Sequence, residues 1–256
     1  MLGLDHIVIA VDDLDAAIAD FTDLGFTVLP GGRHANGATH NALIVLADGT
    51  YLELMALTGD EPQAGTTDYS FLLQDGEGFV GYCMTSDDLD ADAMQMGARG
   101  VEVGTLTAGG RKLKDGTEIK WQTVSIDASM SPFFIQDVTA RNLRVPTDPA
   151  STQHANGATG IIGLTIVVEN VQEAMVHYWQ ITGESIAVAT PDSAMYQLDE
   201  DFTITLAEPA DGAMRMHLQQ RPGVPYMLTL STNDASAAGL LAPPKSHGTR
   251  IVLLHN

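Results

Sequence analysis

The chain has 256 residues, of which 45% are hydrophobic and 18% charged, so it has ample apolar material for a packed core and is not a disordered chain. Its 33 acidic and 12 basic residues give a net charge of −21, which argues against nucleic acid and anionic membranes as partners. A length above 250 residues predicts two packed units within one chain.

Two explanations of the negative charge are open. Acidic pairs stand in turns and at the starts of expected helices, for example Asp12-Asp13 and Asp87-Asp88, which favours a capping and solubilising role. The alternative is an acidic cleft that attracts a cationic ligand. The positions of the acids favour the first explanation.

The N-terminal stretch lacks the basic region of a signal peptide, and no apolar run approaches the roughly 20 residues that a membrane helix needs. The single cysteine, Cys83, cannot form an internal disulfide, and its apolar surroundings in the sequence predict a buried side chain. We therefore expect a cytoplasmic protein.

The first elements follow a clear order. Residues 6–11 form a β-branched run that predicts a strand, and residues 12–25 carry helical spacing from an aspartate start to a glycine stop. Three more strand-like runs follow at 26–29, 41–46 and 51–57, the last two joined by a hairpin turn. This order is one βαβββ module.

The same order returns three times along the chain. The second copy begins at residues 80–85 and stops its helix at Gly100, and the third runs from residue 164 to Gly183. A fourth, eroded copy lies between residues 227 and 254. We predict an α+β fold of paired βαβββ modules that form curved mixed sheets around a cavity, four modules in all with the last truncated.

The composition between the modules predicts the domain boundaries. The first domain spans residues 1–145 and contains modules at 1–58 and 78–140, and a proline-containing linker follows at 146–160. Residues 161–256 form the second domain.

Strand alternation predicts which side chains face the cavity. In the first strand, Ile7 and Ile9 form the bulky set expected to lie beneath the helix, which turns His6 to the opposite face. In the strand at 51–57, the same argument turns Tyr51 and Glu53 to that face. A carboxylate in an apolar strand is costly to bury alone, so His6 and Glu53 are the leading candidates for a functional pair.

Residues 4–15 and 48–54, in the setting of paired βαβββ modules, resemble the vicinal oxygen chelate superfamily. Within it, residues 32–34 followed by 39–41 resemble the bacterial glyoxalase-like domain proteins. This resemblance covers nearly the whole chain for fold, but it is weak for reaction, since the superfamily includes isomerases, extradiol dioxygenases, epimerases, thiol transferases and metal-free antibiotic-binding proteins. It also makes a homodimer plausible.

The resemblance implies a metal site, because superfamily members hold a divalent ion with side chains from two modules. His6 and Glu53 match the positions of the first module. An offset of 75 residues places Gly81 where the second module would carry its histidine, and Gln136 is expected at the last position. The implied ligands are therefore His6, Glu53 and Gln136, with zinc, iron, manganese or nickel as the ion. Equivalent positions in residues 161–256 offer no useful ligand, so this degenerate domain is expected to be structural.

Two further histidines could complete the site. His34 or His40 could supply a third ligand or act as an acid or base, with His40 and Glu53 as the catalytic candidates. Alternatively, both are loop histidines bonded to the backbone. The remaining candidates for ligand binding, besides His34, are Asn41, Tyr51 and Trp121, although aromatic residues are often simply part of a core.

Two functions remain open. The first is a metal-dependent lyase, isomerase or dioxygenase acting on a small oxygenated molecule. The second is a metal-free protein that binds or sequesters a small molecule, which the glycine at position 81 favours. In that case no cofactor is expected.

Overall fold

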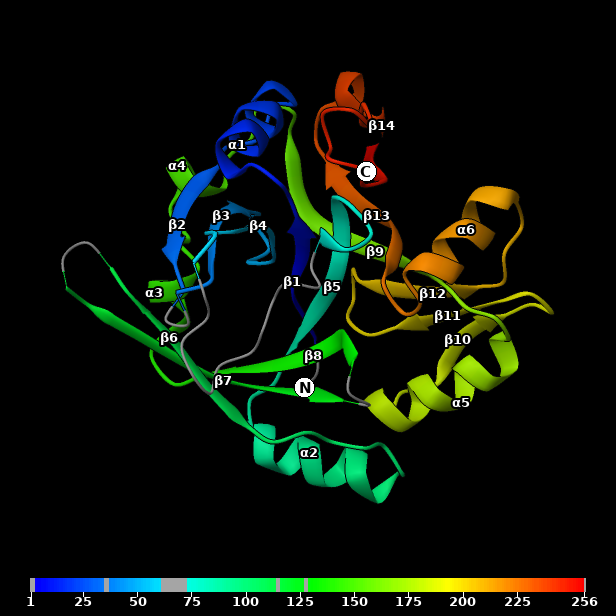
Figure 1. The fold of residues 1–256 in the computed structure, drawn as a ribbon. Helices are drawn as coiled ribbons and strands as arrows, with labels where there is room; N and C mark the ends of the chain where they lie inside the picture. The colour runs from blue at the N-terminus through cyan, green and yellow to red at the C-terminus, as the bar shows by residue number, and fades with distance from the viewer. Residues whose placement is uncertain (1–2, 35–36, 61–72, 114–115, 127–128, 256) are drawn as a thin grey trace.

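The computed structural model describes residues 3–34, 37–60, 73–113, 116–126 and 129–255. It confirms the predicted α+β class, with two mixed sheets and a small number of helices (Figure 1). Each sheet joins two modules side by side through the first strands of those modules, β1 with β5 and β9 with β13.

Eight strands form the first sheet in the order β2-β3-β4-β1-β5-β8-β7-β6. Within each module the first strand runs parallel to the last, as β1 does to β4 and β5 to β8, whereas β1 and β5 are antiparallel. The bounds are β1 (Gly3–Ala10), β2 (Leu29–Arg33), β3 (Thr39–Val45), β4 (Tyr51–Leu57), β5 (Gly78–Thr85), β6 (Thr107–Lys112), β7 (Glu118–Ile126) and β8 (Ser129–Asp137).

Seven strands form the second sheet in the order β10-β11-β12-β9-β13-β15-β14. The fourth module is truncated as predicted, because it has only three strands and the 3-10 helix η2 (Ala235–Ala237) in place of an α-helix. The bounds are β9 (Ala158–Val167), β10 (Ile186–Ala189), β11 (Ser193–Gln197), β12 (Thr203–Ala207), β13 (Pro225–Thr232), β14 (Gly239–Leu240) and β15 (Ile251–His255).

The helices begin where the sequence places polar caps. Asp13, Asp88 and Asn170 accept hydrogen bonds from first-turn backbone N–H groups of α1 (Leu14–Asp23), α2 (Leu89–Ala98) and α5 (Val171–Thr182). Two of these caps come from the predicted acidic pairs. The other helices are α3 (Arg141–Arg144), α4 (Pro149–Thr152) and α6 (Gly212–Gln220).

One hydrophobic core joins the two sheets. It contains the helix-facing side chains of the first sheet, such as Ile7 and Leu52, together with Ile166 and Leu206 of the second sheet. The hydroxyl groups of Tyr82 and Tyr178 meet across this core at 2.8 Å. The predicted burial of Cys83 is confirmed, although its side chain lies outside this core.

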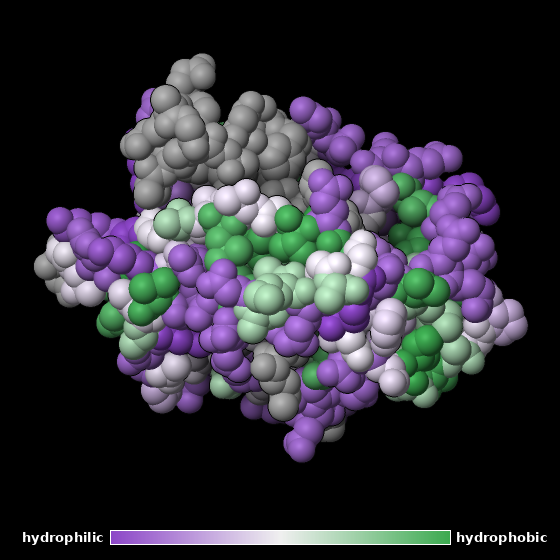
Figure 2. Space-filling view, turned by 90° about the horizontal axis from the view of Figure 1, so that it is seen from below, coloured by the Kyte–Doolittle hydropathy of each residue, from purple (hydrophilic) through white to green (hydrophobic). Residues whose placement is uncertain are grey.

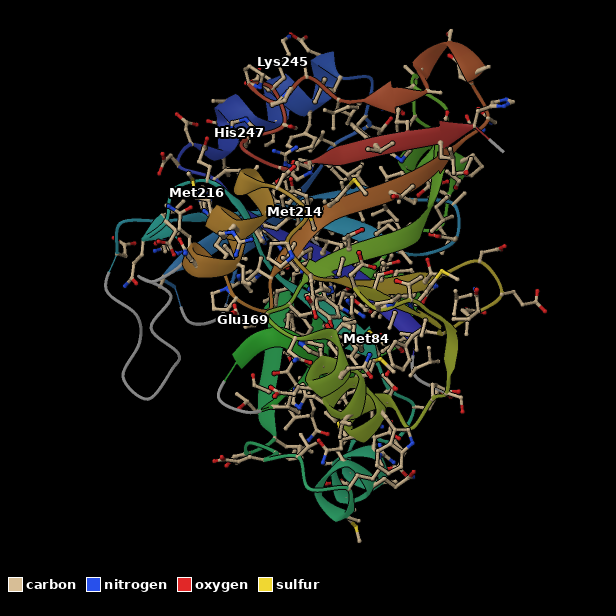
Figure 3. The ribbon with its side chains drawn as sticks, turned by 90° about the vertical axis from the view of Figure 1, so that its right-hand side faces the viewer. Met84, Glu169, Met214, Met216, Lys245 and His247 are labelled. Carbon is tan, nitrogen blue, oxygen red and sulfur yellow. The ribbon has the colours of Figure 1, made fainter. Side chains whose placement is uncertain are left out.

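The last loop of the chain also contacts the first half. His247 Nδ1 lies 2.9 Å from Glu77 Oε1, and Lys245 Nζ donates to Asp23 at the end of α1 over 2.5 Å. Figure 3 shows Lys245 and His247 beside α1, remote from Met84 in the core. The two halves are thus joined by polar contacts at the surface as well as by the apolar core.

The first sheet is strongly curved, with α1 and α2 on its outer side (Figure 1). We call the opposite, concave side the inner face. The α3 segment lies against both ends of this face, because Val145 clusters with Leu43 and Tyr51 while the backbone oxygen of Arg144 accepts a hydrogen bond from Arg111 Nη2 of β6. Residues far apart in sequence therefore meet at the inner face.

Hydrophobic residues lie in patches among hydrophilic ones on the face seen from below (Figure 2). Large exposed apolar side chains on the helices include Met94 of α2 and Trp179 of α5. No helix in the described part of the chain is long and apolar enough to cross a membrane.

Candidate functional site

The structure brings His6 and Glu53 together on the inner face. The two strands pair in parallel with Val8 opposite Glu53, and His6 Nε2 lies 3.4 Å from Glu53 Oε2. Both residues are buried, with 4% of His6 and 8% of Glu53 exposed. Alternation holds around them, because Ile7 and Ile9 belong to the core while Val8 packs on the inner side with Met55.

A β-bulge at Asp5 adds a second polar side chain to this face. The register of β1 against β5 shifts between Leu4 and His6, while Leu4 and Ile7 both remain in the core on the outer side. Asp5 and His6 therefore point to the same face although they are neighbours in sequence. The Asp5 carboxylate is fully buried and accepts a hydrogen bond from His6 Nδ1 over 2.6 Å.

Two arginines from the α3 segment neutralise the buried carboxylates. Arg144 donates to both oxygens of Asp5 over 2.9 Å, to both oxygens of Asp137 over 2.7 and 2.8 Å, and to the Tyr51 hydroxyl over 2.8 Å. Arg141 forms an ion pair with Asp5 Oδ2, which also accepts from Arg144, and donates to the backbone carbonyl of Gly49. Burial acts to raise the pKa of Asp5, but the bonds from His6 and Arg144 hold that pKa well below its usual range.

The Asp5 carboxylate fixes how His6 presents its ring. Because His6 Nδ1 donates to Asp5, the Nε2 atom is directed at Glu53. Tyr51 stacks on the imidazole with centroids 4.5 Å apart, and the Phe133 ring meets it edge-on at 5.5 Å. This carboxylate–histidine pair is the arrangement that orients histidine ligands of metal ions.

Glu53 is held by the β3 side of the sheet. Asn41 Nδ2 donates to Glu53 Oε1 over 2.6 Å, and His34 Nε2 lies 3.4 Å from the same oxygen. Burial acts to raise the pKa of Glu53, but the interactions with His34, His6 and Asn41 lower it to about 2. His34 is fixed in turn by a 2.7 Å hydrogen bond between Nδ1 and the Thr39 hydroxyl. Glu53 is thus ionised at neutral pH.

Gly31 makes room for the Asn41 amide. A Cβ at position 31 would overlap Asn41 Oδ1 and lie 2.9 Å from the Asn41 backbone oxygen. We expect Gly31→Ala to displace the amide from Glu53 and to lower the free energy of unfolding by about 1–3 kcal/mol, the usual cost of overpacking. Urea unfolding measures this loss. Gly97→Ala is the control, because a Cβ at that helical position meets nothing within 4 Å. Equal stability of the two variants would contradict the prediction.

Two imidazoles face the Glu53 carboxylate. His6 Nε2 lies 3.4 Å from Glu53 Oε2 and His34 Nε2 lies 3.4 Å from Glu53 Oε1, so the two histidines approach different oxygens of one carboxylate. An ionised carboxylate and two imidazoles suit zinc and ferrous iron. The residues present therefore fit a divalent ion.

Asp5, His6 and Cys83 also offer ligand atoms within 4.8 Å of one another. However, the Asp5 oxygens already bind two arginines and His6. Burial, with a smaller contribution from the charge of Asp5, raises the pKa of the Cys83 thiol well above its usual range, so that it stays protonated. By their chemistry, His6, Glu53 and His34 are the better ligands, because the Glu53 carboxylate is ionised and neither histidine is paired with an arginine, although the ligand atoms of these three residues do not all lie within 4.8 Å of one another.

The structure places two of the predicted site residues away from this cluster. His40 has the strand parity of Ala42 and Ile44, whose side chains belong to the core on the outer side of the sheet. Gln136 lies beside α2, where its Oε1 accepts from the Leu89 backbone N–H and its Nε2 donates to the Asp87 carbonyl, both over 3.0 Å. Neither reaches Glu53.

Phe133, not Gln136, corresponds to Glu53 in the second module. Glu53 pairs with Val8, and the 75-residue offset maps Val8 to Cys83, which pairs with Phe133. The second module therefore contributes glycine and phenylalanine at the positions where the superfamily would carry ligands.

The remaining candidates lie on the inner face. Tyr51 contacts His6 directly, and Trp121 of β7 shares its face with Gly109, where a Cβ would overlap the indole. Arg111 is two residues from Gly109 on β6 and so has the same parity. Asp5, Arg144 and Arg111 are the residues that sequence reasoning missed, and the signal for Asp5 and Arg111 was a charge within a strand.

The comparisons with known proteins agree with this architecture. A family model described as "Glyoxalase-like domain" matches residues 4–182. The comparison with curated proteins found no match to the chain. Among solved structures, a hypothetical protein from Staphylococcus aureus has a TM-score of 0.78 at 17% identity, with 100% of each chain covered.

Two further solved structures have lower TM-scores. A mutant of 4-hydroxymandelate synthase from Streptomyces coelicolor has a TM-score of 0.63 at 14% identity, with coverage of 94% of this chain and 77% of that one. Methylmalonyl-CoA epimerase from Mycobacterium tuberculosis has a TM-score of 0.40 at 22% identity over 54% and 89% of the two chains. The likenesses to the Staphylococcus aureus protein and to 4-hydroxymandelate synthase support the fold and not the activity. With the family match covering most of its length, the chain belongs to the glyoxalase-like domain family, as its sequence indicated.

Proposed function

We propose that the first half of the chain is a metal-dependent enzyme of the lyase, isomerase or dioxygenase type, in which His6, Glu53 and His34 hold a divalent ion. The observation that supports this is the pair of 3.4 Å separations between the histidine Nε2 atoms and the Glu53 carboxylate. Without a proton or a cation between them, the Nε2 lone pair of His6 and a Glu53 oxygen would face each other as two acceptors in a buried site.

The chain's own residues prepare this site. Asp5 directs His6 Nε2 toward Glu53, and Arg144 and Arg141 keep Asp5 ionised. A pKa of about 2 suits Glu53 as a ligand, which must be deprotonated, better than as a base near neutral pH. When bound, the ion supplies Lewis acidity toward the oxygens of a small substrate. Zinc, iron, manganese and nickel are the candidates.

A metal-free binding protein is the second candidate, and one observation favours it. Gly81 and Phe133 stand where the second module would supply ligands, and the Phe133 ring packs edge-on against His6. The inner face would then recognise a small molecule through its aromatic side chains and Glu53 alone.

A pair of histidine variants tests the first proposal. We expect His6→Ala to weaken metal binding by at least about 100-fold, because it removes a ligand, whereas His40→Ala on the outer side should leave binding nearly unchanged. Protein without an affinity tag is stripped with a chelator and titrated with Zn²⁺, Mn²⁺, Fe²⁺ or Ni²⁺ by calorimetry. Metal analysis of the freshly purified protein accompanies the titration.

Two outcomes would contradict this function. The first is the absence of metal above trace levels together with no binding by the stripped wild type. The second is equal loss of binding in His6→Ala and His40→Ala. If chelator-treated protein binds none of these ions but is stabilised by small organic ligands in a thermal-shift screen, the metal-free candidate is supported instead.

A further inference from the structure

Arg111 lies on the inner face of the sheet without a carboxylate partner. It pairs with Ile119 across β6 and β7, and its parity is that of Gly109, whose Cβ position is covered by the Trp121 indole. Burial lowers the pKa of the Arg111 guanidinium, and the charge of Glu53 acts in the opposite direction. Arg111 Nη2 bonds to the backbone oxygen of Arg144, whose side chain bonds to the Tyr51 hydroxyl beside the His6 ring, so the guanidinium lies on the same side of the sheet as His6 and Glu53.

The other arginines of this face are already paired. Arg141 and Arg144 neutralise Asp5 and Asp137, and Glu53 lies between His6 and His34. Among the described residues, by contrast, no carboxylate lies within ion-pair distance of Arg111. One guanidinium cation is thus left over on the inner face of a chain whose net charge is −21.

The Arg111 guanidinium also retains an unused donor. Its Nη2 donates to the Arg144 backbone oxygen over 3.0 Å, and this bond fixes the position of the group. Its Nε is buried without a hydrogen-bond partner, as is the acceptor Asn41 Oδ1 beside Glu53. Buried polar atoms are nearly always bonded, so an orphaned donor on an arginine indicates a missing acceptor. An arginine edge is the preferred partner of a carboxylate, which it binds with two parallel hydrogen bonds.

We propose that Arg111 anchors a carboxylate group of the ligand, so that the molecule bound beside His6 and Glu53 is a small oxygenated carboxylic acid, such as a 2-oxo or 2-hydroxy acid. This inference rests on the proposed function, because it concerns the ligand of the same face. The evidence for this inference is separate from that for the metal site, since it comes from Arg111 and not from the metal ligands.

The experiment compares acids with neutral analogues of the same shape. Wild-type protein, with and without Zn²⁺, is titrated by calorimetry with pyruvate, lactate and 2-oxoglutarate, with pyruvamide and lactamide as the uncharged analogues, and with inorganic phosphate. We expect at least one acid to bind, and its amide to bind roughly 10- to 100-fold more weakly, as expected for the loss of a charged hydrogen-bonding partner.

Three variants assign the effect to Arg111. Arg111→Gln should reduce acid binding by the same roughly 10- to 100-fold and leave amide binding unchanged. Arg111→Lys keeps the charge but loses the second parallel donor, so it should lie between the wild type and Arg111→Gln. Lys112→Gln is the matched control, because it removes the neighbouring positive charge from an exposed side chain of opposite parity. Circular dichroism checks that each variant is folded.

The outcomes separate this inference from the metal proposal. Acid binding that depends on Arg111 supports the inference even if no metal binds, and unchanged metal affinity in Arg111→Gln shows that the two sites are independent. The inference is overturned if no acid of the panel binds, if the amides bind as tightly as the acids, if only phosphate binds, or if Arg111→Gln and Lys112→Gln lose equal affinity.

Discussion

Asp5→Asn is expected to lower the free energy of unfolding by about 3–5 kcal/mol, the cost of removing one partner from a buried ion pair. Asparagine has nearly the shape of aspartate, but its amide group would direct N–H donors at Arg144 or Arg141, which are themselves only donors. Arg144 is 4% exposed and would remain buried with Asp137 as its one carboxylate. Urea unfolding at pH 7 measures the loss.

The pH dependence of the free energy of unfolding provides a second test of the ion pairs between Asp5 and the two arginines. Because the pKa of Asp5 is depressed in the folded state, its contribution is fully present above the unfolded pKa of about 3.9 and is lost as the pH falls through the lower folded value. The stability difference between wild type and Asp5→Asn should therefore be constant from about pH 5 to 8 and should narrow below about pH 4.

Asp15→Asn is the control for this prediction, because Asp15 is exposed in the first turn of α1. It should change stability by no more than about 0.5 kcal/mol. A loss for Asp5→Asn as small as that of the control would show that the network around Arg144 contributes little to the folded state.

Glu53→Gln is expected to reduce the affinity for divalent metal by more than about 100-fold, since it removes the anionic ligand between two histidines. The fold should survive, because the glutamine Oε1 still accepts the hydrogen bond from Asn41. Calorimetric titration of the chelator-stripped variant gives the affinity. Thermal unfolding with and without Zn²⁺ gives an independent value, since a ligand that binds the folded state alone raises the melting temperature.

Glu118→Gln provides the comparison for this second prediction. Glu118 is an exposed glutamate at the start of β7 that forms an ion pair with Lys120 at the surface, so its loss should not affect metal binding. Metal affinity that is unchanged in Glu53→Gln would remove Glu53 from the ligand set and favour the metal-free function.

Hydrophobic alternation predicted the part of the site that lies on regular strands. His6, Tyr51 and Glu53 share the inner face because β1 and β4 are regular where these residues stand, and side chains two apart in a strand point the same way. Asn41 follows the same logic on β3. The fold class could be predicted for the same reason, since in the strands of each module every second residue faces the helices.

Irregular geometry explains most of what could not be predicted. Parity alone would place Asp5 on the outer side, but the bulge at this residue turns it inward. The choice between His34 and His40 depends on strand parity at the start of β3, which no motif reveals. For Gln136, the pairing of β8 with β5 places Phe133 opposite Cys83, so that Phe133 takes the position in the second module that Glu53 has in the first.

The arginines were missed for a different reason. Arg144 lies in a stretch rich in proline and polar residues, the composition of a linker, and its role appears only when α3 lies against the sheet. Arg111 stands in a glycine-containing segment without the strand, loop and helix setting of a phosphate-binding motif, so the sequence offered no chemistry for it. The contacts of both arginines are long-range, so only the folded chain shows their partners.

The core shared by the two sheets lies on the outer side of the first sheet, whereas the candidate site lies on its inner face. The outer side of the first sheet is committed to packing, together with the second half of the chain, so most inner-face residues are released from that constraint. Substitutions of the other polar residues there can change what is bound without unfolding the protein, with the Asp5 and Arg144 network, the Asn41 site beside Gly31 and the apolar clusters around Val8 and Leu43 as exceptions. The second half, which contributes no ligand to the cluster, thus acts on the first half through the shared core and the surface contacts of Lys245 and His247.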